Sequence, residues 1–298
     1  FFSTRRYTLP MSEPVLQIFH PLVQEWFEQS VGTPTNIQEQ AWPEISAGRH
    51  VLLSAPTGSG KTLSAFLWAI DRLIRAPEAG DEQARVLYIS PLKALNNDIQ
   101  RNLLGPVNEL RKLFEHKGVA FPEMRIMTRS GDTPGTERQR MMRHPPEILI
   151  TTPESLNILL TSRRGRIVFP GIGTVILDEI HAVAGSRRGV HLMSGVERLT
   201  EVCGEFQRIA LSATVRPMER VAGFVGGFRL ETGASYSARP VRILESRAKK
   251  EIQLTVRFPE AIARGGSRAA PGSREEEEER RSFWEKAAVD FRRIIESH

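Results

Sequence analysis

The chain has 298 residues, 40% of them hydrophobic, so it is long enough for one large α/β domain with some remainder. Its 41 Lys and Arg residues outnumber its 35 Asp and Glu residues, and the net charge of +6 favours a polyanionic partner over an acidic one. The single cysteine, Cys203, excludes an intrachain disulfide and any multi-cysteine metal site within these residues. No stretch approaches the roughly 18 apolar residues of a transmembrane helix. We therefore expect no membrane contact and a location in a reducing compartment, the cytoplasm.

The first ten residues contain two arginines and no acidic residue. This segment is too short and too polar for a signal peptide or a membrane span, so Met11 is a plausible start of the native sequence. Phe19, Trp26 and Phe27 follow on what reads as the apolar face of an N-terminal helix. We expect residues 1–14 to form a tail and residues 15–237 to form a first domain.

Residues 54–62 read Ser-Ala-Pro-Thr-Gly-Ser-Gly-Lys-Thr and lie between the apolar run Val51 to Leu53 and a helix-like run that begins at Leu63. A strand, a glycine turn and a helix start make a phosphate cradle, because backbone N–H groups and the helix N-terminus converge on an anion. Lys61 can reach the β- and γ-phosphates, and the Thr62 hydroxyl can ligate Mg²⁺. The predicted nucleotide-binding residues are Ala55, Thr57, Gly58, Ser59, Gly60, Lys61 and Thr62. Ala55 stands where the strict pattern has glycine, and the motif alone does not separate a motor from a kinase.

Two adjacent carboxylates, Asp178 and Glu179, end the apolar run Val175 to Leu177. Such a run is typical of a buried parallel strand, and open α/β sheets bind ligands at the carboxyl tips of these strands. Asp178 is suited to hold the Mg²⁺ that bridges the phosphates, and Glu179 to orient the attacking water. Without the upstream phosphate loop, a solvated acidic pair would be the simpler interpretation. A further run, Ile209 to Leu211, leads into Ser212-Ala213-Thr214, so two hydroxyls follow another strand.

Short apolar runs alternate along the chain with stretches long enough for helices. We predict strands at Val51–Leu53, Val86–Ile89, Met124–Met127, Ile148–Ile150, Val175–Leu177 and Ile209–Leu211. This alternation predicts an α/β fold with a mostly parallel sheet and helices on both faces. We expect Gly105-Pro106 to break the long helical stretch after Pro91.

The order of these motifs resembles that of the DEAD/DEAH-type helicases of superfamily 2. The first, second and third motifs of that family are matched by residues 55–62, 178–181 and 212–214. Its adenine-reading Q motif resembles residues 34–38 (Pro-Thr-Asn-Ile-Gln), and its strand-contacting motifs resemble residues 90–95 and 151–156. The Asp-Glu-Ile-His form, followed by Gly185-Ser186-Arg187-Arg188-Gly189, looks most like the large-helicase-related (Lhr) branch. The resemblance spans residues 34–214 and implies a RecA-like domain that binds ATP and Mg²⁺.

The resemblance also implies roles for individual residues. Gln38 would read the adenine edge, because its amide offers both a donor and an acceptor, and an aromatic side chain, among Phe19, Trp26 and Phe27, would stack on the base. Lys61, Asp178 and Glu179 would serve catalysis. Coupling between the nucleotide and the nucleic acid is implied for His181, Ser212 and Thr214.

Nucleic acid is expected to lie across loops and helix N-termini that contact phosphate oxygens and carry no sequence information. The residues that match the family's strand-contacting motifs, or lie between them, are Pro91, Lys93, Arg129, Gly131, Thr152 and Pro153. Two further basic groups, Arg163-Arg164-Gly165-Arg166 and Arg187-Arg188, are as compatible with solvated loops as with strand contacts.

The character of the chain changes near Ala238. Residues 238–262 look like the connector between the family's two RecA-like domains, with a possible strand at Ile252 to Val256. Residues 263–281 contain five consecutive glutamates and read as a flexible, charged insertion. Residues 282–298 would start a second RecA-like domain, because Phe283, Ala287, Phe291 and Ile294 have helical spacing.

Members of the family are ATP-dependent helicases that translocate along one strand of DNA or RNA, 3′ to 5′ in this branch, with repair or RNA-related roles. The resemblance implies the motor half of such an enzyme. Two alternatives stay open: a nucleotide-switched clamp or remodelling translocase that never separates strands, and a P-loop enzyme of another kind. No Gln-x-x-Gly-Arg-x-x-Arg motif follows Thr214, so the arginine finger of the second domain is not among these residues. We expect the 298-residue polypeptide to hydrolyse ATP slowly and not to unwind.

Overall fold

A seven-stranded parallel sheet organises residues 1–248, the first of the two units into which the chain divides; the second comprises residues 249–298. The computed structural model describes residues 15–77, 83–91, 99–231 and 235–246, together with Arg281, Trp284, Glu285, residues 287–289, Phe291 and Arg292.

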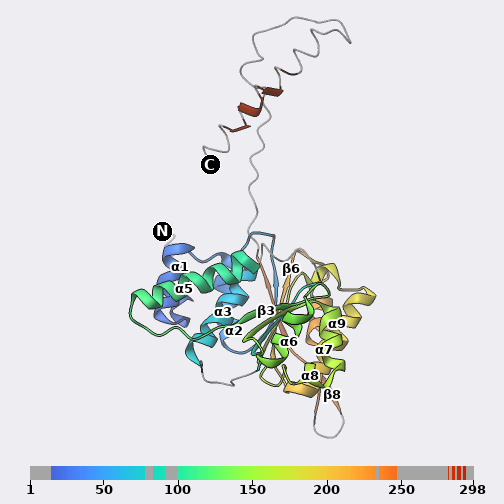
Figure 1. The fold of residues 1–298 in the computed structure, drawn as a ribbon. Helices are drawn as coiled ribbons and strands as arrows, with labels where there is room; N and C mark the ends of the chain where they lie inside the picture. Colours follow the sequence, from blue (N-terminus) through green and yellow to red (C-terminus); the bar gives the residue numbers. More distant parts are fainter. Residues whose placement is uncertain are drawn as a thin grey trace, which may run out of the picture. The chain divides into compact units, whose positions relative to one another are not determined.

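The elements of the first unit alternate between strands and helices along the chain (Figure 1). The strands are β1 (His50–Ser54), β2 (Val86–Ile89), β3 (Ile126–Arg129), β4 (Ile148–Thr151), β5 (Thr174–Leu177), β6 (Gln207–Ser212), β7 (Phe228–Leu230), β8 (Tyr236–Ala238) and β9 (Val241–Glu245). The α-helices are α1 (Pro21–Ser30), α2 (Asn36–Ser46), α3 (Lys61–Arg75), α5 (Gly105–His116), α6 (Gly135–Arg143), α7 (Pro153–Thr161), α8 (Arg163–Arg166), α9 (Arg187–Cys203) and α10 (Met218–Gly226). Shorter turns are η1 (Val15–Ile18), η2 (Gln100–Leu104) and η3 (Ile180–Ala182).

The sheet has the strand order β3-β4-β2-β5-β6-β1-β9, and all neighbouring pairs are parallel. Each of the six predicted apolar runs overlaps one of the strands β1 to β6, and the prediction of a RecA-like parallel sheet is confirmed. Because all strands point the same way, their carboxyl ends meet at one edge. That edge carries the residues after β1, β5 and β6, which are direct neighbours in the order β5-β6-β1.

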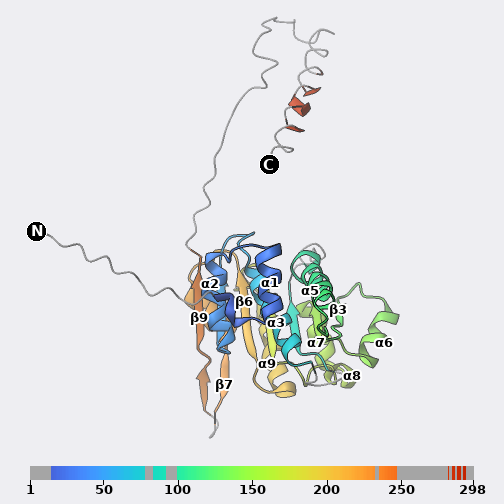
Figure 2. The ribbon, with the colours of Figure 1, turned by 90° about the vertical axis from the view of Figure 1, so that its left-hand side faces the viewer.

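Successive side chains of each strand pack on opposite faces of the sheet. Val51 and Leu53 contact the apolar cluster under α1, α2, α3 and α5, whereas Leu52 contacts the cluster under α7, α9 and α10. The two helical layers lie on either side of the strands in Figure 1, and Figure 2 looks onto the layer of α1, α2 and α3. Burial on both faces explains why these strands are near-continuous apolar runs rather than alternating ones.

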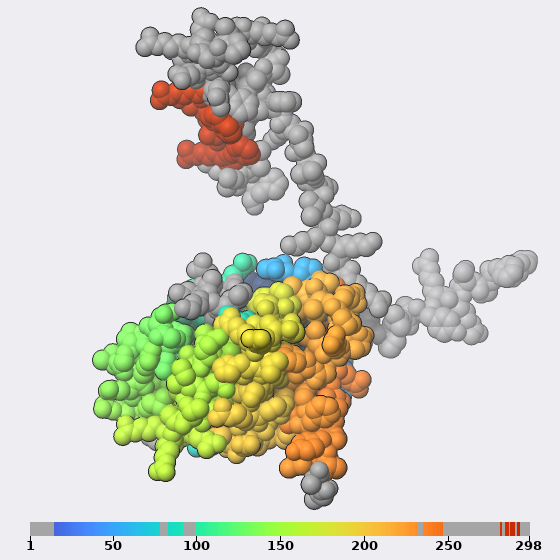
Figure 3. Space-filling view, turned by 90° about the vertical axis from the view of Figure 1, so that its right-hand side faces the viewer, coloured from blue at the N-terminus to red at the C-terminus, as the bar shows by residue number. Residues whose placement is uncertain are grey.

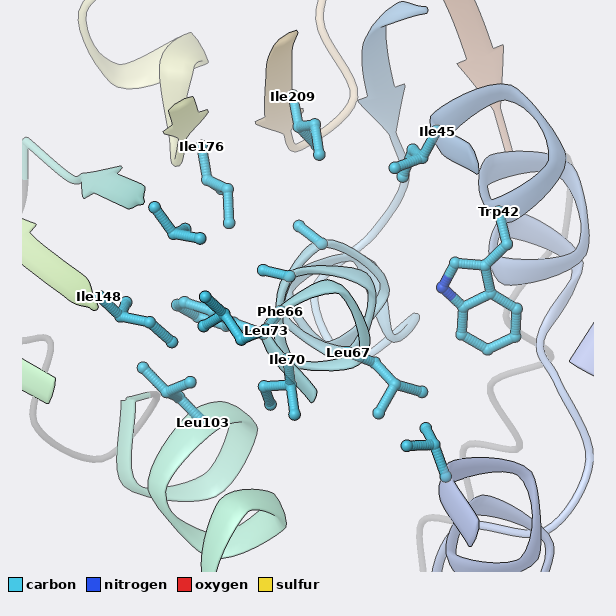
Figure 4. Close-up of a cluster of buried hydrophobic side chains, with 14 of the residues drawn as sticks. Trp42, Ile45, Phe66, Leu67, Ile70, Leu73, Leu103, Ile148, Ile176 and Ile209 are labelled. Carbon is cyan, nitrogen blue, oxygen red and sulfur yellow. The ribbon is translucent and has the colours of Figure 1, made fainter. Parts of the chain in front are cut away.

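Helix α3 lies at the centre of one layer. Figure 4 looks along it, with Ile148, Ile176 and Ile209 of the sheet on one side and Trp42 of α2 on the other. Phe66 of α3 is fully buried and stacks on Tyr88 of β2 with ring centroids 4.8 Å apart. Burying such a side chain contributes about 1.5–3 kcal/mol. The helix that begins at the phosphate loop is therefore fixed firmly to the sheet.

A buried carboxylate fixes the N-terminal helices to the same layer. Asp71 of α3 accepts hydrogen bonds from the His20 amide at 2.6 Å and from Arg75 Nε at 2.7 Å. Arg75 also donates to the Ile18 carbonyl at 2.9 Å. Burial raises the pKa of Asp71, against the lowering effect of these partners. The contacts hold the start of α1 against α3 and so position Trp26, further along α1.

Residues 228–245 differ from the expectation. Residues 238–262 are predicted to be a connector, but Val241–Glu245 form β9, which pairs with β1 at the edge of the sheet. Strands β7 and β8 form an antiparallel ribbon that projects from the unit (Figure 3), with Phe228 and Leu230 each 61% exposed. Continuous apolar runs predict strands that are buried on both faces. Strands β7, β8 and β9 are not buried in this way, so the search for apolar runs did not find them. The domain boundaries themselves stay predictions.

The expected helix break at Gly105-Pro106 is wrong. Residues Gln100–Leu104 form a π-helical turn that continues directly into α5, where Pro106 occupies the first turn. Proline is tolerated there because the first N–H groups of a helix have no intrahelical acceptor. The amide of Gly105 instead donates to the Gln100 carbonyl, which closes the wider turn.

In the second unit, the described residues between Arg281 and Arg292 have helical conformation, in agreement with the predicted helix over 283–295, and Ala287 is 5% exposed. The predicted strand at 252–256 and, apart from Arg281, the predicted insertion of residues 263–281 lie outside the described residues, as do residues 1–14. None of the helices that the structure describes is long and apolar enough to cross a membrane.

Candidate functional site

Three predicted motifs meet because the strands that precede them are neighbours in the sheet. They are the phosphate loop (residues 54–62), the acidic pair Asp178-Glu179 and the segment Ser212-Ala213-Thr214. Ser54 and Ser212 are register partners in β1 and β6, and the Ala55 amide donates to the Ser212 carbonyl at 3.2 Å. Asp178 follows β5 on the other side of β6. Three motifs distant in sequence thus form one edge of the sheet.

The phosphate loop turns sharply into α3. Gly60 precedes the helix with φ 88°, and a Cβ there would lie 2.7 Å from Gln38 Nε2, so the position requires glycine for both backbone and space. Lys61 Nζ donates to the carbonyls of Ala55 at 2.6 Å and Pro56 at 3.0 Å. The Lys61 side chain therefore lies along the loop, where an incoming phosphate would compete for it. Burial lowers the pKa of Lys61, while the carboxylates of Glu179 and Asp178 act in the opposite direction.

The two carboxylates occupy different environments. Asp178 is 6% exposed, accepts a hydrogen bond from the Tyr88 hydroxyl, and accepts the Glu179 amide at 2.8 Å. Burial raises the pKa of Asp178, and those two hydrogen bonds lower it in part. Glu179 is half-buried and has φ 48°, the one positive φ outside glycine among the residues that the structure describes. A left-handed residue costs about 1 kcal/mol or more and turns the Glu179 side chain sharply out of the strand direction.

A cavity of about 680 Å³ brings these groups together. It is lined by Thr35, Gln38, Thr57, Gly58, Gly60, Lys61, Thr62, Asp178 and Glu179, and on its far side by Trp26, Arg101, Asn102 and Glu109. Its volume is within the range of small-molecule and cofactor sites. Of the predicted nucleotide residues, Ala55 and Ser59 do not line the cavity: Ala55 is buried beneath the loop, and the Ser59 carbonyl accepts the Thr35 hydroxyl at 2.8 Å.

Gln38 has a structural role in addition to its predicted one. Its Oε1 accepts the Thr35 amide at 2.8 Å, and its Nε2 lies 3.5 Å from the Gly60 carbonyl. Thr35 and Gln38 thus form a capping box at the start of α2. The Thr-x-x-Gln spacing is a sequence signal for that motif, which the sequence analysis missed. Gln38 is 1% exposed and fixed by these contacts where it lines the cavity.

The structure separates the three aromatic candidates. Phe19 and Phe27 pack edge-on against Trp42 in the core, with centroid distances of 4.9 Å and 5.4 Å. Trp26 lines the cavity, and its Nε1 donates to Glu109 at 2.8 Å. Only Trp26 of the three is placed to contact a ligand there.

Arg101, Asn102 and Glu109 are cavity residues that the sequence analysis did not identify. The first two come from the π-helical turn η2 and the third from α5. A π turn widens a helix by one residue and is frequent at functional sites. No residue pattern in this sequence predicts such a turn.

His181 connects the acidic pair to the Ser-Ala-Thr segment. Its Nδ1 accepts the Ala213 amide at 3.1 Å, and its Nε2 lies 3.2 Å from Glu179 Oε2. Ser212 donates to the Ala213 carbonyl at 2.7 Å, whereas Thr214 is exposed. Of the three predicted coupling residues, the structure therefore brings His181 and Ser212 into one hydrogen-bonded group.

The predicted nucleic-acid residues occupy the other half of the same edge, after β2, β4 and β3. Pro91 is buried at the end of β2, Gly131 is exposed in the loop after β3, and Lys93 lies outside the described residues. Thr152 caps α7 by accepting the Ser155 amide at 3.4 Å, and Pro153 is the first residue of that helix. The predicted contacts thus include a helix N-terminus, which favours an anion.

Arg129 is unusual among the arginines. It is 6% exposed, and the only hydrogen bond of its side chain in the described part of the chain runs from Nη1 to the Ser130 carbonyl at 2.5 Å. Its Nε is buried there without a partner. Burial and the guanidinium of Arg138 lower the pKa of Arg129. An uncompensated cation at this place would gain from an approaching phosphate.

The two weaker basic groups differ. Arg163, Arg164 and Arg166 are exposed on the short helix α8. Arg188 pairs with Glu154 in a fork, from Nε to Oε1 at 2.6 Å and from Nη2 to Oε2 at 3.1 Å. Arg188 is therefore paired within the protein, although 41% of its side chain is exposed.

The donor set of the cavity suits Mg²⁺. The Thr62 hydroxyl and the Asp178 carboxylate both line it, and hard oxygen ligands are what Mg²⁺ prefers. The part of the chain that the structure describes contains no group of three His, Cys, Asp or Glu residues that could hold a metal ion. Mg²⁺ commonly uses one or two carboxylates together with substrate phosphates, so such a group is not required.

Fold and site together define a P-loop nucleotide-binding domain of the RecA-like type. The sequence profile of the DEAD/DEAH box helicases matches residues 35–221, and the chain belongs to that family. One curated relative is an ATP-dependent helicase Lhr-Core protein 2 of Thermococcus barophilus, which is 48% identical over 76% of this chain and 26% of its own length. Another is an Lhr helicase/uracil glycosylase of Escherichia coli, which is 43% identical over 87% of this chain and 17% of its own length.

A solved structure of the Lhr helicase of Mycobacterium smegmatis, bound to ssDNA and AMP-PNP, superposes with a TM-score of 0.72 at 40% identity. It covers 96% of this chain and 34% of that protein. The predicted resemblance to the large-helicase-related branch is confirmed. The chain spans between 17% and 34% of the length of these three proteins.

Proposed function

We propose that the chain is the ATP-binding motor half of an ATP-dependent helicase that acts on single-stranded DNA or RNA, or on duplexes with single-stranded tails, in the 3′ to 5′ direction. The observation that carries the proposal is the convergence of Lys61, Thr62, Asp178 and Glu179 on one cavity, with His181 joining Glu179 to the strand tip of β6. A second RecA-like domain would complete both sites, as it does in the family that the chain resembles.

In the nucleotide site, the amides of the phosphate loop and Lys61 would bind the β- and γ-phosphates. Thr62 and Asp178 would hold Mg²⁺, which supplies charge neutralisation at the phosphates. Glu179 would accept a hydrogen bond from the attacking water and orient it. Both carboxylates line the cavity: Glu179 is half-buried and has a left-handed backbone, whereas Asp178 is 6% exposed.

In the nucleic-acid site, Thr152, Pro153, Gly131 and Arg129 would contact the phosphate backbone, together with Pro91 and Lys93. Two features support this: the helix N-terminus at α7 and the buried guanidinium of Arg129, whose Nε has no hydrogen-bond partner among the described residues. Backbone contacts of this kind carry no sequence information, as a translocating motor requires. The ssDNA in the structure of the Mycobacterium smegmatis relative is further support.

The test is binding of labelled single-stranded DNA and RNA by the purified protein, with and without a non-hydrolysable ATP analogue and Mg²⁺. We expect binding that changes with nucleotide in the wild type and does not change in Lys61→Ala. Nucleotide binding with no affinity for either nucleic acid would contradict the proposal. Strand displacement by the full-length protein then separates a helicase from a translocase that never unwinds.

A further inference from the structure

Helices α7 and α9 lie side by side and run in the same direction. Arg188 in the first turn of α9 contacts Glu154 in the first turn of α7, and one turn later Asn157 Nδ2 donates to the His191 carbonyl at 3.2 Å. Figure 3 shows yellow α9 beside yellow-green α7. The two helix starts are therefore at the same end of the pair.

The start of α7 is the predicted strand contact at Thr152 and Pro153. Glu154 follows immediately, and its side chain is 50% exposed. A free carboxylate at this place would repel a phosphate backbone. The fork from Arg188 satisfies both carboxylate oxygens and neutralises the charge. The same contact lowers the pKa of Glu154 to about 2, so the carboxylate that Arg188 binds is ionised at neutral pH.

The backbone that presents Arg188 is fixed by a compact turn after the acidic pair. Ser186 Oγ donates to the Val183 carbonyl at 2.7 Å and accepts the Gly189 amide at 3.1 Å. A Cβ at residue 189 would lie 2.2 Å from the Val183 carbonyl oxygen, so only glycine fits. The backbone from which the Arg188 side chain reaches Glu154 is thus fixed by the turn at the start of α9.

We propose that Arg188 is a positioning residue for nucleic-acid binding: it draws the Glu154 carboxylate toward α9 and neutralises it, so that the start of α7 can accept a backbone phosphate. The inference rests on the proposed function. Arg188 acts through Glu154 and makes no contact with the strand.

The test is a double-mutant cycle read by binding of labelled single-stranded DNA and of nucleotide. Arg188→Ala removes the arginine and leaves the Glu154 carboxylate charged without a cationic partner, and we expect strand affinity to fall about tenfold, the effect of losing one charge-assisted contact. Nucleotide affinity should change less than about twofold. Adding Glu154→Ala to Arg188→Ala removes the repulsive charge and should restore strand affinity close to that of the wild type. Glu154→Ala alone should bind the strand as the wild type does.

Arg125→Ala is the matched control. Arg125 pairs with Glu147 at 2.8 Å, and the two residues directly precede β3 and β4. The pair therefore lies at the amino ends of the strands, away from the carboxyl ends that carry the two sites. It should not alter strand binding. A loss in Arg188→Ala that Glu154→Ala fails to restore would overturn the inference, since Arg188 would then contact the strand itself. Unchanged affinity in Arg188→Ala would overturn it as well. If Arg188→Ala does not fold, Arg188→Gln replaces it in the cycle. Absence of strand binding in the wild type would instead overturn the proposed function, and the inference with it.

Discussion

The backbone amide of Ala213 donates a hydrogen bond to Nδ1 of His181 at 3.1 Å. Because Nδ1 is the acceptor, the neutral ring carries its proton on Nε2, which lies 3.2 Å from Glu179 Oε2. One imidazole thus joins the carboxylate at the end of β5 to the backbone at the end of β6. A shift of either segment breaks one of these two contacts.

Replacing His181 should uncouple the nucleotide site from the nucleic-acid site without abolishing binding at either. In His181→Ala, nucleotide and single-strand affinities measured separately should stay within about threefold of the wild type, because His181 contacts neither phosphate loop nor α7. The change in strand affinity on adding a non-hydrolysable ATP analogue should disappear. If the nucleotide effect persists in full, the link runs through other residues.

Lys61 and Glu179 should fail in different ways. Lys61→Ala removes the cation that we propose contacts the β- and γ-phosphates, and we expect at least tenfold weaker nucleotide binding, about 1.4 kcal/mol. Glu179→Gln keeps the side-chain volume and should retain nucleotide binding while removing hydrolysis, since an amide cannot polarise the water in the same way. Calorimetric binding and phosphate release measure the two effects. Equal loss of binding in both variants would refute the assigned roles.

Gln38 combines a helix cap with a predicted base contact, and two substitutions separate them. Gln38→Ala removes the acceptor for the Thr35 amide and should lower stability by about 0.5–2 kcal/mol. Gln38→Glu keeps the acceptor and loses the amide donor, so stability should be largely retained. Both variants should prefer ATP over GTP less strongly than the wild type. Unchanged selectivity in both would assign base recognition to the wall formed by Trp26, Asn102 and Glu109.

The ion pair of Glu154 gives a pH-dependent signature. The Arg188 hydrogen bond lowers the pKa of Glu154 from its ordinary 4.5 to about 2. Because the pKa of Glu154 is lower in the folded protein, the ion pair stabilises the fold at pH values above the ordinary pKa of a glutamate. This stabilisation is lost as the pH falls toward 2, and for this half-exposed pair it is at most about 1 kcal/mol. Carboxyl NMR titration should show the low pKa in the wild type and a return toward 4.5 in Arg188→Ala. A normal pKa in the wild type would show that the fork does not persist in solution.

Cys203 should react slowly with thiol reagents. Its Sγ donates to the Leu199 carbonyl at 3.1 Å, and burial raises the pKa of the thiol from 9.0 to about 11. The thiolate fraction at pH 8 is then about a hundredfold lower than for an ordinary cysteine. Labelling of the native protein, compared with the same protein in denaturant, measures the ratio. Equal rates would mean that the end of α9 opens readily.

The phosphate loop and the acidic pair were predictable because each follows a strand buried on both faces. Val51 to Leu53 and Val175 to Leu177 are continuous apolar runs, and the glycine-rich Lys-Thr segment and the acidic pair follow them directly. Parallel strands then place those residues at one edge whatever the intervening sequence. Asp178, Glu179 and Lys61 were identified for this reason.

The opposite wall of the cavity was not predictable by the same means. Trp26 and Glu109 come from helices whose packing, not whose local sequence, brings them together at 2.8 Å. Arg101 and Asn102 depend on a π turn that replaces an expected helix break. The pairing of Arg188 with Glu154 likewise joins residues 34 positions apart and required the relative placement of two helices.

Strand β9 has a practical consequence for expression of this domain. It covers the hydrogen-bonding edge of β1, whose residues Val51, Leu52 and Leu53 are fully buried. A polypeptide ended at residue 237, where the sequence alone places the domain boundary, would leave that apolar strand with open N–H and C=O groups, a template for pairing with a second molecule. Arg242, 66% exposed on β9, instead puts a charge on the outer edge. Retaining Val241–Glu245 should therefore keep the ATP-binding domain from aggregating.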